Sequence, residues 1–171
     1  MAIGMKGKFK VICNSSPLIN LSKIKRLDLL EKIYQQIIIP TAVYDELIIK
    51  GASKEGVNEL QNLIEKNIIN IQKVNNTSFV KALNKDLDYG ESEVIALALE
   101  VKADLVVIDE KNARMIAEIY DLKKTGFLGV LIKAKREGYI KSVKSYLEQI
   151  REKGFWIDKR LYDKILEKLN E

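Results

Sequence analysis

The stretch that decides the fold reads DLVVID and runs from residue 104 to residue 109. Its four central residues, Leu105 to Ile108, are all apolar, with no alternating polar position. Such a continuous apolar run is typical of a parallel strand that helices cover on both faces. Asp109 ends the run, and residues 111–120 have a helical pattern. The stretch therefore predicts a strand followed by a helix, as in α/β proteins.

Similar units are predicted along the rest of the chain. Apolar runs indicate strands at residues 10–13, 37–39 and 68–71, and a short segment near 123–124 leads to the turn Thr125-Gly126. Helical patterns cover residues 18–24, 27–34, 41–50, 54–66, 77–85, 90–101, 127–137, 142–153 and 158–169. Ser16 before Pro17 is expected to cap the first of these helices. Because strands that alternate with helices are joined by right-handed crossovers, we expect an α/β fold, a three-layer α/β/α sandwich with a central, mainly parallel sheet.

The length of 171 residues and the hydrophobic content of 47 % predict one domain with a sizeable core. We expect a tail at residues 1–9, the α/β domain at residues 10–157, and a C-terminal helix at residues 158–171 that packs on the same domain. The opening residues lack the apolar core of a signal peptide, and no apolar run approaches the ~18 residues of a membrane span. The chain is therefore expected to be cytoplasmic, with no membrane partner.

The composition excludes several classes of enzyme. The chain has no histidine, and Cys13 is its only cysteine. Ser-His-Asp and Cys-His nucleophiles, disulfide frameworks, zinc fingers and iron–sulfur sites are therefore impossible. Any hydrolysis must use carboxylates, lysines, hydroxyls or an oxygen-liganded metal. The net charge of +5 fits a polyanionic partner such as nucleic acid, and a solvated Lys/Glu-rich surface explains it equally well.

Polar residues follow two of the predicted strands. Asn14 comes after the run at residues 11–13. Asp109 comes after the run at residues 105–108. Ligands of open α/β sheets bind at the carboxyl ends of the strands, so both side chains are candidates for a binding site. Asn and Asp are also good helix N-caps, and for either residue alone this structural interpretation stays open.

Glu91 is predicted to face the core. It lies in the middle of the apolar face of its helix, which is formed by Val94, Ile95, Ala98 and Leu99. A buried carboxylate is costly unless it is paired or bound to a metal. The alternative is an acid that the helix dipole favours in the first turn, which does not explain the inward direction. Glu93 and Glu100 fall on the opposite side and are expected to face water.

Glu46 is also predicted to lie near the apolar face of its helix, at residues 41–50, but the pattern is less clear than for Glu91. It lies beside Val43 on a flank that carries both polar and apolar residues, so an ordinary amphipathic helix also explains its position. Asp45 is the alternative candidate on the same helix. Together the candidates are three carboxylates and one amide: Asn14, Glu46, Glu91 and Asp109. Such a set suits an octahedral magnesium or manganese ion, which would activate water for hydrolysis.

These residues lie in motifs that resemble the PIN-domain family of metal-dependent ribonucleases. The branch with a Ser-Ser-Pro opening, related to VapC-type toxins of toxin–antitoxin pairs, is the most similar. The matching motifs are VICNSSPLI at 11–19, VYDEL at 43–47, GESEVIALA at 90–98, Asp109-Glu110 with Ala113-Arg114, and TGFLGVL at 125–131. The resemblance covers about residues 10 to 157 and implies that this region is a PIN-like domain.

The resemblance implies cleavage of RNA phosphodiester bonds with Mg²⁺ or Mn²⁺ as the cofactor. By position, Glu46, Glu91 and Asp109 take the places of the family's catalytic acids, and these three together with Asn14 would be metal ligands. RNA is the expected partner. The toxin-related branch adds an antitoxin protein as a candidate partner, and a second copy of the chain is another.

Three positions depart from the family pattern. Position 14 is an amide in place of an aspartate, Val107 replaces the common Thr or Ser, and Asn112 replaces a further acid. The set is therefore less anionic than in typical active members. This leaves a second hypothesis open: a catalytically weakened PIN-like domain that binds RNA or protein. A small-molecule-binding domain is disfavoured, because no Gly-rich phosphate loop follows a predicted strand.

Further residues are predicted to contact RNA. Arg114 and Lys111 flank Asp109 and are expected to bind phosphates, Arg114 with its bidentate fork. For Lys111 a solvated helix face is an equally good interpretation. Ser15 is expected to hydrogen-bond a phosphate or a metal-bound water.

Overall fold

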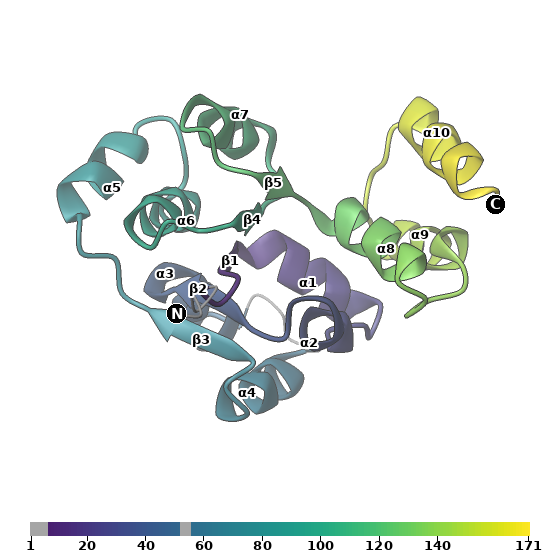
Figure 1. The fold of residues 1–171 in the computed structure, drawn as a ribbon, viewed down its shortest axis with the longest axis horizontal. Helices are drawn as coiled ribbons and strands as arrows, with labels where there is room; N and C mark the ends of the chain where they lie inside the picture. Colours follow the sequence, from purple (N-terminus) through teal and green to yellow (C-terminus); the bar gives the residue numbers. More distant parts are fainter. Residues whose placement is uncertain (1–6, 52–55) are drawn as a thin grey trace, which may run out of the picture.

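The computed structural model describes residues 7–51 and 56–171. In this part of the chain five parallel strands form one sheet in the order β3-β2-β1-β4-β5 (Figure 1). The strands are β1 (Val11–Cys13), β2 (Ile37–Pro40), β3 (Ile69–Gln72), β4 (Leu105–Val107) and β5 (Lys124–Thr125). Ile12 of the central strand pairs with Ile38 on one side and Val106 on the other. The prediction of an α/β sandwich with a parallel sheet is confirmed.

Helices cover both faces of the sheet. They are α1 (Ser15–Lys23), α2 (Asp28–Tyr34), α3 (Thr41–Tyr44), η1 (Asp45–Ile49), α4 (Val57–Glu65), α5 (Thr77–Leu83), α6 (Tyr89–Glu100), α7 (Lys111–Ile119), α8 (Phe127–Arg136), α9 (Val143–Glu152) and α10 (Lys159–Leu169). α6 packs on β1, β2 and β4, and Figure 1 shows α1 and α8 on the other side of the sheet. Within the described residues no helix is both long enough and apolar enough to cross a membrane.

The central strands are buried because both of their faces carry apolar side chains. All three residues of β1 are buried, and Cys13 is a fully buried free thiol. Burial raises the pKa of Cys13 well above its usual range, and the nearby charges of Asp109 and Glu110 add to this effect. Cys13 is therefore a core residue.

The first helix begins earlier than the sequence predicts. α1 starts at Ser15, and Asn14 occupies the N-cap position with an extended backbone (φ −83°, ψ 169°). Pro17 lies within the first turn, where its missing N–H removes no helical hydrogen bond. The prediction that Ser16 caps this helix is wrong, because Ser16 lies inside the first turn.

The segment predicted as one helix at residues 41–50 contains a wide turn. α3 ends at Tyr44 and continues as the π-helix η1, in which the amide of Lys50 donates to the carbonyl of Asp45 at 2.8 Å. Such turns redirect the side chains around them and are frequent at functional sites. Glu46 is on this turn.

Two expectations fall partly outside the described residues. These are the predicted tail at residues 1–9 and the start of the helix predicted at 54–66, whose described part is α4.

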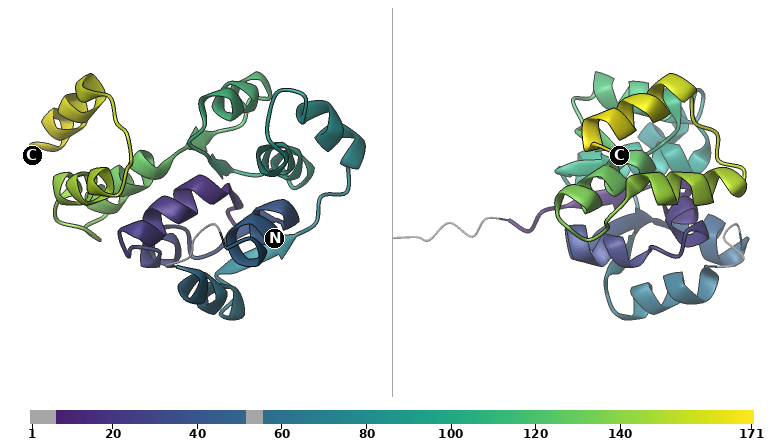
Figure 2. Two further views of the ribbon diagram at one scale, coloured as in Figure 1. Left: turned by 180° about the vertical axis from the view of Figure 1, so that it is seen from behind. Right: turned by 90° about the vertical axis from the view of Figure 1, so that its right-hand side faces the viewer.

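The last two helices lie beside α8 at one end of the molecule (Figures 1 and 2). α10 buries Ile165 and Leu166. The Glu171 carboxylate accepts hydrogen bonds from the amides of Val143 and Lys144 at 2.9 and 2.8 Å, and it also pairs with Lys135 of α8. These bonds lower the pKa of Glu171 to about 2, against the opposing effect of burial. They tie the end of α10 to α8 and to the start of α9.

Candidate active site

The site is built around the carboxyl end of β1. The amide of Asn14 donates to the carbonyl of Val107 at 3.0 Å, which extends the pairing of β1 with β4 by one residue. The Asn14 side chain is buried, and its Nδ2 donates to Glu110 Oε2 at 3.1 Å. Its Oδ1 atom is buried without a hydrogen-bond partner among the described residues. Asn14 therefore offers a free acceptor at the strand end.

Glu46 reaches the same place from the wide turn η1. Its Oε2 accepts a hydrogen bond from Ser15 Oγ at 2.8 Å. A Cβ added to Gly90 would lie 3.5 Å from Glu46 Oε2 and 3.9 Å from Asn14 Oδ1. The missing side chain at position 90 thus leaves space beside both oxygens.

Glu91 belongs to a capping box at the start of α6. Its amide donates to Asp88 Oδ1 at 2.7 Å, and its Oε2 accepts from the amide of Asp88 at 3.0 Å. Burial raises the pKa of Glu91, the Asp88 amide opposes this, and the charges of Asp88, Glu110 and Glu46 raise it further. Glu91 therefore takes the helix-start role that the sequence leaves open, and it also lies buried beside other acids.

Asp109 is directed toward α8. Its Oδ1 accepts a hydrogen bond from the amide of Phe127 at 2.8 Å, so it binds the start of α8, whereas Glu110 occupies the N-cap of α7. A Cβ at Gly126 would overlap this same Oδ1 atom. The other oxygen, Oδ2, is buried and has no hydrogen-bond partner in the described part of the chain.

The surroundings of Asp109 favour its protonated form. Burial raises its pKa to about 6, and the negative charge of Glu110 adds to this effect. The Phe127 amide, the Arg114 cation and the Asn20 side chain act in the opposite direction and lower this pKa. Arg114 is held nearby, because its guanidinium donates to the carbonyl of Ile108 at 2.9 Å.

Glu110 is a site residue that the sequence did not predict. It accepts hydrogen bonds from Asn14 Nδ2 and from Ser16 Oγ, so it joins the end of β1 to the start of α7. Its signal in the sequence is its position directly after Asp109, at the end of the same predicted strand. The resemblance to PIN domains implies a role for Asp109 at this strand end and none for Glu110.

The expectation that Glu93 faces water is wrong. Glu93 is buried, and its Oε2 accepts from the amide of Ala42 at 2.8 Å. This amide lies in the first turn of α3, where N–H groups have no partner within the helix and need an outside acceptor. Residues 90–98 of α6 are all buried, so this helix has no solvent-exposed face over that length.

The predicted site residues are thus only partly brought together. Asn14, Ser15 and Glu46 lie at the end of β1, with Glu91 in electrostatic range of Glu46. Asp109 is next to them in the sheet but points to α8, with Arg114 beside it. Lys111 is exposed on α7, and within the described structure its side chain makes no hydrogen bond or ion pair with these residues.

The donor set can be tested for its fit to a divalent metal. Within residues 7–51 and 56–171 no three acidic or thiol side chains form a metal-binding group. Each acid instead uses a donor of its own: Ser15 for Glu46, the Asp88 amide for Glu91, and the Phe127 amide for Asp109. The chemistry of the set still fits a hard cation, because its donors are oxygens and, among the described residues, Asn14 Oδ1 and Asp109 Oδ2 are buried without partners.

A family model described as PIN domain matches residues 10–171, which includes the sheet, all of these site residues and α10. A comparison with curated proteins finds no match.

Proposed function

Since the chain belongs to the PIN-domain family, we propose that it is a magnesium- or manganese-dependent endoribonuclease. PIN domains are usually nucleases and generally use divalent metals. The choice of RNA as the substrate is supported by the Ser-Ser-Pro motif at residues 15–17 and by the basic net charge of +5. The same motif supports a role as the toxin of a toxin–antitoxin pair, with an antitoxin protein as partner.

The observation that carries the proposal is a pair of buried oxygens without partners among the described residues. Asn14 Oδ1 and Asp109 Oδ2 follow two strands that are neighbours in the sheet. Native proteins satisfy nearly all buried polar atoms, so such a pair needs an explanation. A divalent ion with its water ligands provides one, and the adjacent acids Glu46, Glu91 and Glu110 supply the negative charge.

Four of the site residues share the task of holding the metal ion. Asn14, Glu46, Glu91 and Asp109 would hold the metal ion, which when bound lowers the pKa of water and stabilises charge on the phosphate. The Phe127 amide fixes one oxygen of Asp109 and leaves the other free. With a pKa of about 6, Asp109 is mostly ionised at neutral pH.

The cation and the hydroxyl beside these acids act as positioning groups. Ser15 fixes Glu46 by a hydrogen bond. Arg114, anchored to the carbonyl of Ile108, places a positive charge beside Asp109, where it can bind a phosphate of the RNA.

One observation favours the second candidate, a weakened PIN domain that binds RNA or protein without cleaving it. The acids do not converge on one point in the described residues, and the residue at position 14 is neutral. Both features would reduce the affinity for a metal ion.

A metal titration separates the two candidates. The full chain is titrated with MnCl₂ and MgCl₂ by calorimetry, and cleavage of a mixed pool of RNA oligonucleotides is followed at each metal concentration, with EDTA as the control. We expect saturable binding and cleavage that rises with occupancy. RNA binding without metal-dependent cleavage would instead support the second candidate.

A further inference from the structure

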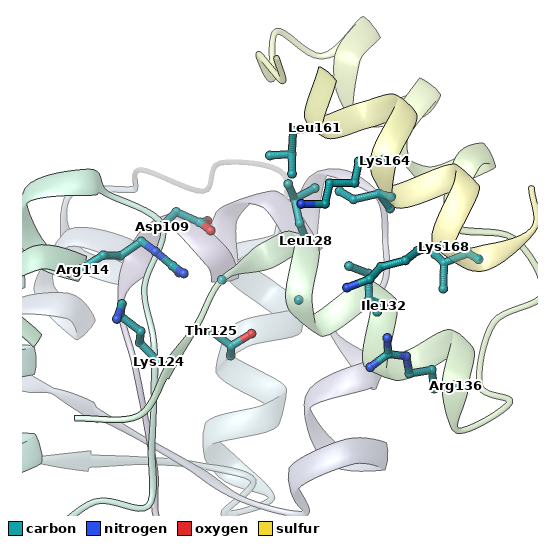
Figure 3. Close-up of a pocket in the computed structure, with 14 residues that line it drawn as sticks. Asp109, Arg114, Lys124, Thr125, Leu128, Ile132, Arg136, Leu161, Lys164 and Lys168 are labelled. Atoms are coloured by element: carbon teal, nitrogen blue, oxygen red, sulfur yellow. The ribbon is translucent and has the colours of Figure 1, made fainter. Parts of the chain in front are cut away.

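A cavity of about 650 Å³ lies between α8 and α10 and reaches Asp109 (Figure 3). This volume is within the range of ligand-binding sites. We call this cavity the α8–α10 groove. It is formed by β5, α8 and α10 together with Asp109 and Arg114, so it opens directly beside the candidate active site.

The groove is lined by cations on both sides. These are Arg114, Lys124, Arg136, Lys164 and Lys168, and among the described lining residues Asp109 is the only acid. Figure 3 shows Arg114 and Asp109 on one side and Lys164, Lys168 and Arg136 on the other, with their side chains directed toward the space between them. Such an arrangement creates a positive potential inside a concave surface, which attracts a polyanion.

Three of these cations have no counter-ion in the part of the chain that the structure describes. There Arg136, Lys164 and Lys168 make no ion pair and no side-chain hydrogen bond, and all three are exposed. Lys124 binds Glu118 at 3.1 Å, but that partner is 76 % exposed. Positive charges that are close together and unpaired repel one another, so an anionic ligand would relieve this repulsion.

Part of the lining of the groove is aliphatic. It comprises Leu128 and Ile132 of α8 and Leu161, Ile165 and Leu169 of α10. Leu161 is 44 % exposed, so part of this apolar surface is open to a ligand. No aromatic side chain of the described residues lines the groove, which makes contacts with a phosphate backbone more important than stacking on bases.

We propose that the α8–α10 groove binds the phosphate backbone of single-stranded RNA next to the bond that is cleaved. The proposal rests on the proposed ribonuclease function and assigns α10 to the substrate-binding surface. Five cations against one acid, among the described lining residues, fit a chain with one negative charge per nucleotide. The bonds of Glu171 to Lys135 and to the start of α9 hold α10 in place as one wall of the groove.

The test compares two double variants of the full chain. Lys164→Gln/Lys168→Gln removes two charges from the groove, and Lys81→Gln/Lys85→Gln removes two exposed charges from α5 and the segment after it, away from α10 (Figure 1). Binding of a fluorescein-labelled single-stranded RNA of mixed sequence is measured by anisotropy in EDTA over a range of salt concentrations. Circular dichroism verifies that both variants are folded.

The groove variant is expected to bind the RNA about 10-fold more weakly, and the slope of log K against log salt should become shallower by about 1.4. The α5 control should bind like the wild type. Equal affinities of the groove variant and the wild type would overturn the proposal. It would also be overturned if poly-glutamate displaced the RNA at an equal concentration of charge, because the groove would then prefer an acidic polypeptide.

This assay separates the groove from the enzyme activity, because binding is measured without metal. Lysine-dependent RNA binding by a protein that cleaves no RNA with Mn²⁺ or Mg²⁺ would contradict the proposed function and support the groove. Cleavage by the wild type, with no loss of RNA affinity in the groove variant, would support the function and overturn the groove.

Discussion

The acidic strand ends and the α8–α10 groove meet at Asp109, yet they are built in opposite ways. At the strand ends, the acids are fixed by hydrogen bonds, as Ser15 fixes Glu46 and Phe127 fixes Asp109. In the groove, the long side chains of Arg136, Lys164 and Lys168 are exposed and have no partner among the described residues. Chemistry at one bond requires fixed atoms, whereas contacts with phosphates along a strand tolerate adaptable ones.

This difference predicts two kinds of response to substitution. Changes at the strand ends should remove activity and leave RNA affinity almost unchanged. Changes in the groove should reduce RNA affinity gradually and in a salt-dependent way.

The largest effect is expected for Asp109→Asn. It should lower Mn²⁺-dependent RNA cleavage by at least about 100-fold, because an anionic ligand is lost. The asparagine Oδ1 can still accept from Phe127, so the fold should be kept. Cleavage by wild type and variant is compared on the mixed RNA pool, with RNA anisotropy in EDTA as the control. Full cleavage by a folded variant would remove Asp109 from the site.

The same variant, Asp109→Asn, should be more stable than the wild type when no metal is bound. Because the folded-state pKa of Asp109 is raised to about 6, the wild type loses stability as the pH rises from about 4 through 6, when this carboxyl ionises. The neutral side chain of the variant avoids this loss. Metal-free Asp109→Asn should therefore melt at a higher temperature than the wild type at pH 7, and the difference should shrink at pH 4.

Glu91→Gln tests whether the capping box and the site can be separated. Glutamine also fits a capping box, and the pKa of Glu91 is raised by burial and by neighbouring acids. The metal-free variant should be as stable as the wild type or more stable at pH 7, and its metal affinity should fall about 10-fold. Calorimetry and thermal melting provide the two measurements. Lower stability with normal metal binding would make Glu91 a structural residue only.

Glu171→Gln alters the groove wall without touching the acids. The Glu171 charge binds Lys135 and two amides, so its loss should lower stability by about 1–2 kcal/mol and weaken RNA binding a few-fold. The lowered pKa of Glu171, about 2, means that this stability is present above pH 4.5 and is lost as the pH falls toward 2. Melting curves from pH 7 to pH 2 should show the difference between the two proteins narrowing only at the acidic end.

The smallest effect is expected for Asn14→Asp. A charged ligand should tighten Mn²⁺ binding a few-fold and raise cleavage at limiting metal. Asn14 donates to Glu110 at 3.1 Å, however, and aspartate would replace that bond by repulsion between two carboxylates. The metal-free variant should therefore be less stable than the wild type. Identical binding isotherms for the two proteins would exclude Asn14 as a ligand.

The sheet was largely predictable from the sequence, because the runs at residues 37–39 and 105–108 are buried strands with a local signal. β5 was only indicated as a short segment, since Lys124 and Thr125 carry no apolar pattern. The burial of Glu93 and the role of Glu110 could not be predicted locally, because their donors, Ala42 and Asn14, are distant in the sequence. Local periodicity identifies elements, whereas the bonds that complete a site depend on how those elements meet.

The close approach of Gly126 to Asp109 restricts which substitutions these two positions can accept during evolution. Its φ of −137° is open to any residue, so glycine is required here for space alone. A Cβ would overlap Asp109 Oδ1 and lie 3.2 Å from the carbonyl oxygen of Ile108. Substitutions at positions 109 and 126 should therefore be correlated. Among relatives, a chain that has gained a side chain at the position of Gly126 should also have lost the aspartate, so the glycine would mark lineages that keep this acid in place.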